Sequence, residues 1–339
     1  MHPAAALFAA GEVLPDLPVC DHYAGIESRM RKSLALQAES GEPAGRALFD
    51  VTLDAEDGAP VGGEREHAQL IAELVDSPLN RWNRVGARVH PFGHPAFETE
   101  LELLLRRAGS RLAYLMVPKV ADLDEAWRAC QAVRAAEKAA GLAREVPIHM
   151  LIETHGAVRH AHAIAALAGV ESLSFGLMDF VSAHRGAIPA SAMGVEGQFE
   201  HPLVVRAKLE VAAACHAAGK TPSHCVVTEF SDVEALGRAA RRASRELGYT
   251  RMWSIHPDQI MPIVEAFAPD AADVRDAAEI LLAARAVDWA PIRHRTRGRD
   301  TLHDRASYRY YWHVLARAHR TGRPLPQDVL QAFFQEHLA

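Results

Sequence analysis

Eight short runs of apolar, often β-branched residues alternate with longer helical patterns in this 339-residue chain. Such alternation is typical of βα units, in which helices join parallel strands. Eight units fit a closed barrel better than an open doubly wound sheet, and no glycine-rich nucleotide fingerprint follows any run. The sequence therefore predicts an α/β fold, the TIM (β/α)8 barrel, and no nucleotide cofactor. The predicted strands are Leu17–Cys20, Leu48–Leu53, Gly86–Val89, Ala113–Val117, Ile148–Ile152, Leu173–Gly176, Cys225–Thr228 and Met252–Ile255.

Capping residues mark the ends of the helices between these runs. One helix is predicted to begin at Asp122 or Asp124 and to end at Gly141, where glycine permits a left-handed residue. Another is predicted to begin after Ser231 and to end at Gly248. These helices would cover the outside of the barrel.

The chain divides by composition and residue pattern into three parts. We predict an N-terminal arm over residues 1–16, the barrel over 17–269 and a basic, helical extension over 270–339. From Pro291 onward there are nine arginines and no lysine, against three aspartates and one glutamate, although the whole chain carries a net charge of -6. A positive arm on a negative body favours packing on the barrel or on a neighbouring subunit over binding to an acidic partner, a phosphorylated ligand or RNA.

An aromatic stripe in the extension must also be buried somewhere. The segment SYRYYWHVLARAHR places Tyr308, Tyr311, Trp312, Leu315 and His319 along one predicted helix. The barrel already has helices on its outside, so a neighbouring subunit is the natural receiver, and we predict a homo-oligomer. The alternative is that the extension covers its own barrel.

Composition excludes several classes of protein. Hydrophobic residues make up 49% and charged residues 24% of the chain, which argues against a disordered or fibrous protein. The mild net charge gives no reason to expect nucleic-acid binding, and no apolar run is long enough for a membrane span. The four cysteines lie far apart without a CxxC pair, as expected for reduced thiols in a cytoplasmic protein. The N-terminus lacks the basic region of a signal peptide.

Acids and two cations gather where the predicted strands end. In a barrel these positions face the active site, so the pattern predicts a site for an anionic ligand and a cation. Any one such residue could instead cap a helix or form a structural ion pair. The residues are Asp54, Glu56 and Asp57, Arg88, Lys119, Glu153, and Asp179.

The same strand ends carry a resemblance to a known family. In order along the chain stand LDAEDGAP, ARVH, MVPKV, LIET, SFGLMDF and SIHPDQI. This series resembles the HpcH/HpaI aldolase/citrate lyase family, most closely its citrate lyase beta-subunit-like branch. The resemblance implies a (β/α)8 barrel, a Mg²⁺ site, reversible carbon–carbon bond chemistry on α-keto or acyl-thioester substrates, and assembly into trimers or hexamers.

The chain departs from the family pattern on the first predicted strand. The family commonly has an arginine-serine pair and a Pro-Gly phosphate-binding turn there, where this chain reads LPVCDHYAG. This departure predicts weak binding of coenzyme A and favours a free carboxylate substrate over an acyl-CoA thioester.

Glu153 and Asp179 are the predicted metal ligands. They end adjacent strands, so their carboxylates can meet, and Mg²⁺ takes carboxylate oxygens together with water and substrate. Mn²⁺ could occupy the same site. The resemblance supports the assignment. The ion would bind an α-keto acid or polarise a carbonyl group.

Arg88 is the predicted clamp for a substrate carboxylate, because its rigid fork fixes a planar acid better than lysine does. Glu56 and Asp57 are predicted to orient metal-bound water or Arg88. Gly176 and Met178 of the SFGLMDF run are predicted to contact the substrate.

His22 replaces the missing turn and is a candidate general acid or base, although a single histidine is more often a packing residue. Lys119 is predicted to be electrostatic or structural, because a metal-dependent mechanism needs no Schiff base. His256 is predicted to position the last loop.

The leading hypothesis is a Mg²⁺-dependent carbon–carbon lyase for aldol- or Claisen-type cleavage or condensation of a small carboxylate or its thioester. One alternative is hydrolysis of a β-hydroxyacyl-CoA thioester at the same site. Another is a non-catalytic barrel subunit whose basic tail binds a partner.

Overall fold

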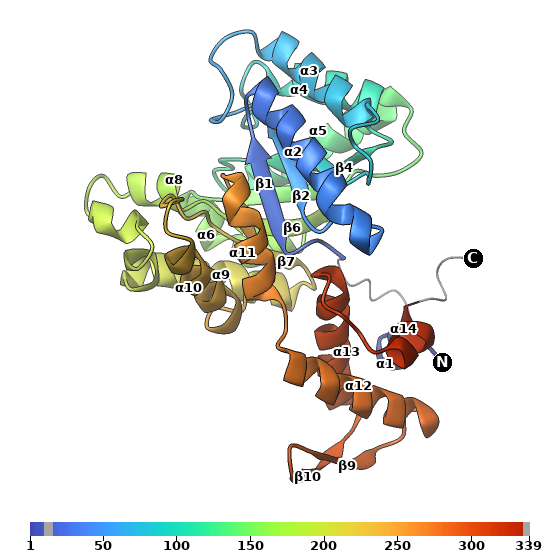
Figure 1. Cartoon of the computed structure of the whole chain (residues 1–339). Coiled ribbons are helices and arrows are strands. Elements are labelled where there is room, and N and C mark those ends of the chain that lie inside the picture. The colour runs from blue at the N-terminus through green and yellow to red at the C-terminus, as the bar shows by residue number, and fades with distance from the viewer. Residues whose placement is uncertain (10–15, 335–339) are drawn as a thin grey trace. The chain divides into compact units, whose positions relative to one another are not determined.

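The computed structural model describes residues 1–9 and 16–334, which fall into two compact units (Figure 1). One unit spans Pro15–Phe267. The other combines Met1–Leu14 with Ala268–Ala339. Each unit has a hydrophobic core of its own. No helix in the described residues is long and apolar enough to cross a membrane.

The first unit is a closed barrel of eight parallel strands in sequence order, which confirms the predicted TIM barrel. Strand β1 pairs with both β2 and β8, and this pairing closes the barrel. The strands are β1 (Cys20–Ala24), β2 (Asp50–Asp54), β3 (Val85–Arg88), β4 (Leu112–Val117), β5 (Ile148–Ile152), β6 (Val170–Phe175), β7 (Thr221–His224) and β8 (Arg251–Ser254).

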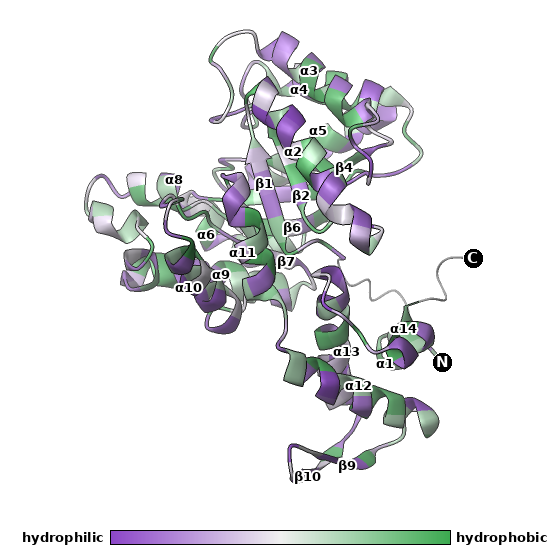
Figure 2. Ribbon diagram, in the orientation of Figure 1, coloured by the Kyte–Doolittle hydropathy of each residue, from purple (hydrophilic) through white to green (hydrophobic). Residues whose placement is uncertain are grey.

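Helices surround the strands, and their sides alternate between hydrophilic and hydrophobic residues, as Figure 2 shows for α3 and α4. The helices are α2 (Glu27–Gly41), α3 (Glu64–Asp76), α4 (Phe97–Ala108), α5 (Leu123–Ala140), α6 (His155–Arg159), α7 (Ala161–Ala165), α8 (Leu177–Ser182), α9 (Pro202–Ala217), α10 (Val233–Arg245) and α11 (Pro257–Phe267). Short 3₁₀ turns cover Glu42–Ala44, Ala190–Met193 and Gly197–Phe199.

Two of the predicted caps can be compared with the helix ends. Asp122 caps α5 by accepting the N–H of Glu125, and Gly141 ends the helix at a φ of 70°, both as predicted. The predicted cap of α10 is wrong by one residue, because Asp232, and not Ser231, accepts the N–H of Ala235, and the predicted end is also wrong, because the helix ends at Arg245, before Gly248. Either residue type can cap, so the sequence alone did not separate them.

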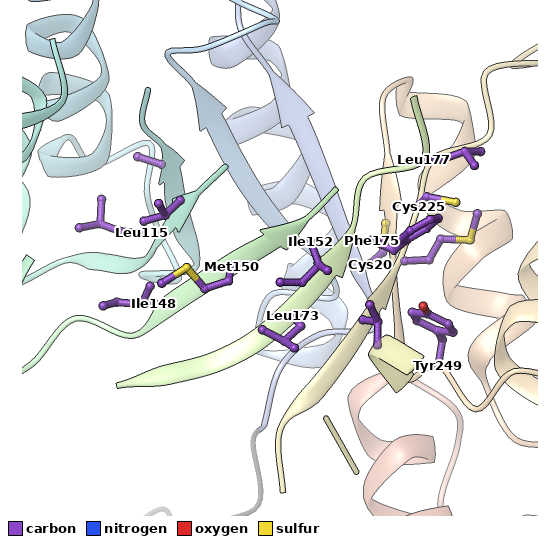
Figure 3. Packing of buried hydrophobic residues seen from close by; sticks show 14 of the residues in the cluster. Cys20, Leu115, Ile148, Met150, Ile152, Leu173, Phe175, Leu177, Cys225 and Tyr249 are labelled. Atoms are coloured by element: carbon purple, nitrogen blue, oxygen red, sulfur yellow. The ribbon is translucent and has the colours of Figure 1, made fainter. Parts of the chain in front are cut away.

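Alternation along each strand sorts side chains between two regions. Ile148, Met150 and Ile152 of β5 belong to the large core between strands and helices (Figure 3). His149 and Leu151 point the other way, into the barrel, where His149 stacks on Tyr114 at 3.8 Å between ring centroids. Since this alternation has a period of two, it also decides which residue at each strand end reaches the barrel mouth.

A buried ion network crosses the barrel interior below the mouth. Arg251 is fully buried, with Nη1 2.5 Å from Asp50 Oδ2 and Nη2 3.1 Å from Asp21 Oδ2. Asp50 also accepts two hydrogen bonds from Arg84, at 2.7 and 2.8 Å. Paired in this way, the charges avoid the large cost of an isolated buried ion. The network ties together β8, β1, β2 and the residue before β3.

Two strands lie at other positions in the sequence than predicted. Strand β1 was predicted at Leu17–Cys20 but begins at Cys20, and β7 was predicted at Cys225–Thr228 but ends at His224. The β-branched run CVVT has the stronger local preference, whereas TPSH forms the strand because Thr221 and Ser223 align with β6 and β8. As a result, Asp21 and His22 lie within β1 and do not follow it.

The second unit contains the predicted C-terminal helices, together with an N-terminal helix and a hairpin that were not predicted. Its elements are α1 (Pro3–Leu7), α12 (Ala271–Ala286), β9 (Ile292–Thr296), β10 (Arg299–His303), α13 (Arg305–Arg320) and α14 (Gln327–Phe333). Strands β9 and β10 form an antiparallel hairpin around Arg297 and Gly298, which both have positive φ. This turn geometry favours a hairpin, but the arginine-rich sequence had indicated only a polar stretch.

The aromatic stripe of α13 is buried within the second unit. Tyr308, Trp312 and Leu315 pack in one core with residues of α1, α12 and α14. The expectation that a neighbouring subunit must receive the stripe is therefore wrong, and the predicted oligomer loses this support. Ala6 and Leu7 of the predicted N-terminal arm join the same core. Residues 10–15 of that arm and 335–338 of the predicted last helix lie outside the described residues.

One buried cation of the barrel unit leads to a prediction about stability. Lys208 is fully buried, and Nζ donates to Gln198 Oε1 at 2.8 Å. Burial lowers the pKa of Lys208 to about 8. In the unfolded chain this pKa stays near 10.4, so between these values the unfolded state binds more protons and stability rises with pH. From pH 7 to 9.5, wild type should gain about 2 kcal/mol relative to Lys208→Met in urea titrations. A constant difference between the two proteins would contradict this.

Candidate active site

A cavity of about 870 Å³ opens at the carboxyl ends of the barrel strands. In this fold that end of the barrel carries the active site. The cavity is lined by seven of the eight residues predicted for the site, and Glu56 lies just outside it. The seven are His22, Asp57, Arg88, Glu153, Gly176, Met178 and Asp179.

Arg88 lies at the end of β3 and is held in one orientation. Its Nε and Nη2 donate to the two carboxylate oxygens of Asp54 at 2.7 and 2.5 Å, and Nη1 is 3.0 Å from Glu56 Oε2. Asp54 takes two of the five guanidinium N–H groups, which leaves donors on Nη1 and Nη2 for a ligand. The predicted clamp is thus in the cavity, fixed from behind by an acid to which the sequence analysis assigned no role.

Glu56 and Asp57 differ in their surroundings. Glu56 is buried between Arg88 and Lys119, as expected for a residue that orients Arg88. The Asp57 side chain is 59% exposed and contacts Lys119 Nζ at 2.8 Å. Burial acts to lower the pKa of Lys119, but hydrogen bonds to Asp57 and Glu56 outweigh it and raise this pKa. Lys119 is therefore a charged ion-pair residue and is poorly suited to Schiff-base chemistry.

Glu153 directly follows β5 and points into the mouth of the barrel. It is 2% exposed, and Oε1 accepts the backbone N–H of Lys119 at 2.9 Å. Lys119 has a φ of 53°, a rare conformation for a residue with a side chain, and this conformation accompanies the bond to Glu153. Burial, reinforced by the charge of Asp179, raises the pKa of Glu153 to about 8.

Asp179 lies in the first turn of α8, directly after β6, and lines the same cavity. The charge of Glu153, which burial and Asp179 disfavour, would be stabilised by a divalent cation, and one or two carboxylates are what proteins usually offer to Mg²⁺. No group of three or more His, Cys, Asp or Glu side chains that could hold a metal ion is present within residues 1–9 and 16–334, so Glu153 and Asp179 would need water and substrate to complete the coordination. The residues present thus fit a hard cation completed by water and substrate.

Gly176 and Met178 frame the acid pair. A Cβ atom on Gly176 would lie 2.2 Å from Glu153 Oε2, so only glycine leaves room for that carboxylate. Met178 is half-buried and lines the cavity. The role of Gly176 that the structure supports is to leave space for the Glu153 carboxylate, whereas its predicted contact with substrate stays a prediction.

His22 is buried and lies on the face of β1 that it shares with Cys20 and Ala24, which belong to the core between strands and helices. Its Nδ1 is 2.9 Å from the Ser254 hydroxyl, which donates to the carbonyl of His256. Burial, reinforced by the charge of His256, lowers the pKa of His22 to about 4. Side chains alternate along β1, so the next residue, Tyr23, points into the barrel interior. These contacts give a general acid or base role for His22 no support.

The floor of the mouth is apolar. Tyr23 of β1 stacks on Trp253 of β8 at 4.4 Å between centroids, and both pack with Met116 and Leu151. Arg88 lies over the Tyr23 ring at 5.5 Å. An apolar wall lowers the local dielectric and strengthens the interaction of Arg88 with a bound carboxylate.

Sequence reasoning missed a group of residues on the other side of the cavity. Arg29 and Lys32 of α2 are exposed, line the cavity and form no ion pair within the described residues. Phe230, which follows β7, also lines it and is 57% exposed. No motif marks them. The only available signal was the spacing of Arg29 and Lys32, which places both on one face of a helix.

Comparisons with known proteins find relatives by sequence and by fold. A citrate lyase from Burkholderia xenovorans LB400 is 52% identical, with 98% of this chain and 99% of that one covered and a TM-score of 0.81. An L-malyl-CoA/β-methylmalyl-CoA lyase from Cereibacter sphaeroides is 28% identical over 249 residues, 70% of this chain and 77% of the relative. The CitE protein of Mycobacterium tuberculosis, in complex with magnesium, acetoacetate and coenzyme A, is 21% identical and shares the fold, with a TM-score of 0.62 over 89% of this chain and 98% of that one.

A family model also matches most of the barrel. The HpcH/HpaI aldolase/citrate lyase model covers residues 40–257, which include five of the six motifs in full and the first part of SIHPDQI. The strand ends that carry these motifs are the ones that supply Arg88, Glu153 and Asp179 to the cavity. The chain therefore belongs to the HpcH/HpaI aldolase/citrate lyase family.

Proposed function

We propose that the protein is a Mg²⁺-dependent carbon–carbon lyase that cleaves or forms an aldol- or Claisen-type bond in a small carboxylic acid carried as a coenzyme A thioester. The observation that carries the proposal is the division of one cavity into two sides. Arg88, Glu153 and Asp179 follow β3, β5 and β6, whereas Arg29 and Lys32 follow β1. A ligand with a reacting acid at one end and phosphates at the other matches this division.

On the acid side, Glu153 and Asp179 would hold the ion, with Mn²⁺ as a possible substitute. When bound, the ion supplies a Lewis acid for negative charge developing on a carbonyl oxygen. Arg88 binds and orients the substrate carboxylate through its remaining N–H groups, while Asp54 and Glu56 prevent it from turning away. The Tyr23–Trp253 stack gives this end of the cavity an apolar floor.

On the phosphate side, two cations replace the turn that strand β1 lacks. The expectation of weak coenzyme A binding rested on that turn, but Arg29 and Lys32 reach the cavity from the next helix. Three residues apart on α2, they present two positive charges on one face. The relatives named for malyl-CoA and β-methylmalyl-CoA make these two thioesters the first substrates to test.

The two alternatives explain fewer of these features. A thioester hydrolase would need a base for its water. The histidine best placed by sequence, His22, lines the cavity, but its Nδ1 is 2.9 Å from the Ser254 hydroxyl and burial lowers its pKa to about 4, which makes it a weak base. A non-catalytic subunit would have no use for the buried Arg88–Asp54 pair and the two acids in the mouth of the cavity.

Assembly and location stay predictions. The family resemblance favours a homo-oligomer, a trimer or a hexamer, and light scattering of the intact protein tests it. All four cysteines are free and buried, which agrees with the reduced thiols expected in the cytoplasm.

Removing both cations of α2 should weaken the binding of a coenzyme A thioester but not that of an analogue without the nucleotide phosphates. In Arg29→Ala/Lys32→Ala, the KM for a malyl-CoA substrate should rise about ten-fold, or about 1.4 kcal/mol, because exposed charge–phosphate contacts are modest and screened. The pantetheine analogue, which lacks the nucleotide phosphates, should be cleaved as before. Arg31→Ala is the matched control, since Arg31 lies on the same helix but pairs with Glu27. Equal KM values in the double variant and wild type would contradict the assignment.

A further inference from the structure

An exposed aromatic residue stands on the wall of the cavity. Phe230 is 57% exposed although it lines the cavity, and Ile255, which also lines the cavity, is 43% exposed. Large apolar side chains left open at the rim of a pocket mark a surface that a ligand covers. Neither residue contributes to the acid side of the cavity described above.

Phe230 does not stand alone, because its ring lies on the imidazole of His256. The ring centroids are 5.2 Å apart and the planes differ by 19°. The turn that carries His256 is fixed from three sides. Its carbonyl accepts the Ser254 hydroxyl at 2.9 Å, its N–H donates to Gln259 Oε1 at 3.3 Å, and its Nδ1 accepts the N–H of Asp258 at 3.3 Å. The two rings are thus stacked nearly parallel, both residues line the cavity, and the Phe230 side of the stack is largely exposed.

The position of this pair around the barrel identifies its neighbours. Strands β7, β8 and β1 are consecutive in the closed sheet. Phe230 follows β7, His256 follows β8, and Arg29 and Lys32 follow β1. The flat aromatic surface and the two cations therefore occupy the same side of the cavity, opposite the acids that follow β5 and β6.

We infer that the Phe230–His256 pair is a stacking platform for the purine ring of the coenzyme A substrate, with Arg29 and Lys32 on the phosphates beside it. This inference rests on the proposed thioester function. Any planar base can stack on an aromatic side chain, because every base has a π-face. Loss of one such ring weakens nucleotide binding markedly. A ligand that joins a planar base to phosphates is the chemistry that this side of the cavity matches.

The test compares coenzyme A with 4′-phosphopantetheine, which keeps the arm but lacks the adenosine part. In calorimetric titrations, Phe230→Ala should weaken coenzyme A binding on the order of ten-fold and leave phosphopantetheine binding unchanged. Phe230→Trp, which keeps a flat ring, should bind coenzyme A within about two-fold of wild type. Val233→Ala is the matched control, because Val233 is 48% exposed, close in sequence and outside the cavity lining.

The outcomes separate the inference from the proposed function. If Phe230→Ala weakens both ligands equally or neither, the platform for the base is refuted while the thioester proposal stands. If the variant keeps its coenzyme A affinity but changes the mass seen by light scattering, Phe230 is a subunit contact and the inference is again refuted. If wild type binds no coenzyme A, the proposed function fails first.

Discussion

Replacing Glu153 by glutamine and Asp179 by asparagine should abolish Mg²⁺ binding and lower turnover on the order of 10³-fold or more. Both changes keep the size of the side chain and remove the negative charge that a hard cation requires. The Glu153→Gln change should not disrupt the fold, since an amide oxygen can still accept the Lys119 N–H that Glu153 Oε1 accepts. Calorimetric titration with Mg²⁺ and Mn²⁺ measures the binding directly.

The matched control removes the same two charges from the outside of the barrel. Glu102 on α4 and Asp124 on α5 are exposed acids in ion pairs with Arg106 and Arg128. Glu102→Gln/Asp124→Asn should bind Mg²⁺ as wild type does, and both variants should keep stabilities within roughly 1 kcal/mol of wild type. Equal Mg²⁺ affinity in the Glu153/Asp179 variant and in wild type would remove the metal from the account.

The second large effect concerns the clamp. Arg88→Lys should lower kcat/KM on the order of 10² to 10³-fold, because lysine cannot hold Asp54 and still offer a rigid fork to the substrate. Lysine keeps a positive charge beside Asp54, which is buried, so the protein should still fold. Steady-state kinetics on a malyl-CoA substrate measure the loss.

The chain provides a matched control for this change as well. Arg84 also donates two hydrogen bonds to one carboxylate, from Nε and Nη2 to Asp50 at 2.7 and 2.8 Å, but it does not line the cavity. Arg84→Lys should therefore destabilise the protein and leave kcat/KM within about two-fold of wild type. If both lysine variants lose the same activity, Arg88 acts only through the fold and the clamp is refuted.

Much of the acid side of this site could be predicted from the sequence, for a physical reason. Each of Asp54, Arg88 and Glu153 stands at or just after a strand end, in phase with the inward-facing residues of that strand. Strand ends in a parallel barrel meet at one rim, so residues far apart in sequence come together without any knowledge of side-chain contacts. The pairing of Arg88 with Asp54 needed the register of β2 against β3, which the sequence does not state.

The phosphate side could not be predicted in the same way. Arg29 and Lys32 are ordinary cations on a polar helix face, and only the closure of β1 against β8 brings them to the same cavity as Phe230. The role of His22 stays a prediction for a related reason. His22 lines the cavity, but its contact with the Ser254 hydroxyl and the burial that lowers its pKa to about 4 depend on the pairing of β1 with β8, which the sequence does not state.

The aromatic stripe of α13 shows the limit of patterns that indicate burial. Its spacing correctly required that Trp312 and Leu315 be covered, but it contained no information about the covering surface. The N-terminal helix α1 and the helices α12 and α14 supply that surface within the same chain. A pattern of this kind predicts that a face is buried and leaves the partner open.

The most direct test of the account is product analysis with malyl-CoA and β-methylmalyl-CoA in the presence of Mg²⁺. A carbon–carbon lyase splits the acyl chain and releases a shorter acyl-CoA together with a carbonyl acid, and the thioester stays intact. We predict these two products in equal amounts, their loss on chelation of the metal, and no free thiol. Release of free coenzyme A without a carbonyl product would show thioester hydrolysis at this site and contradict the lyase.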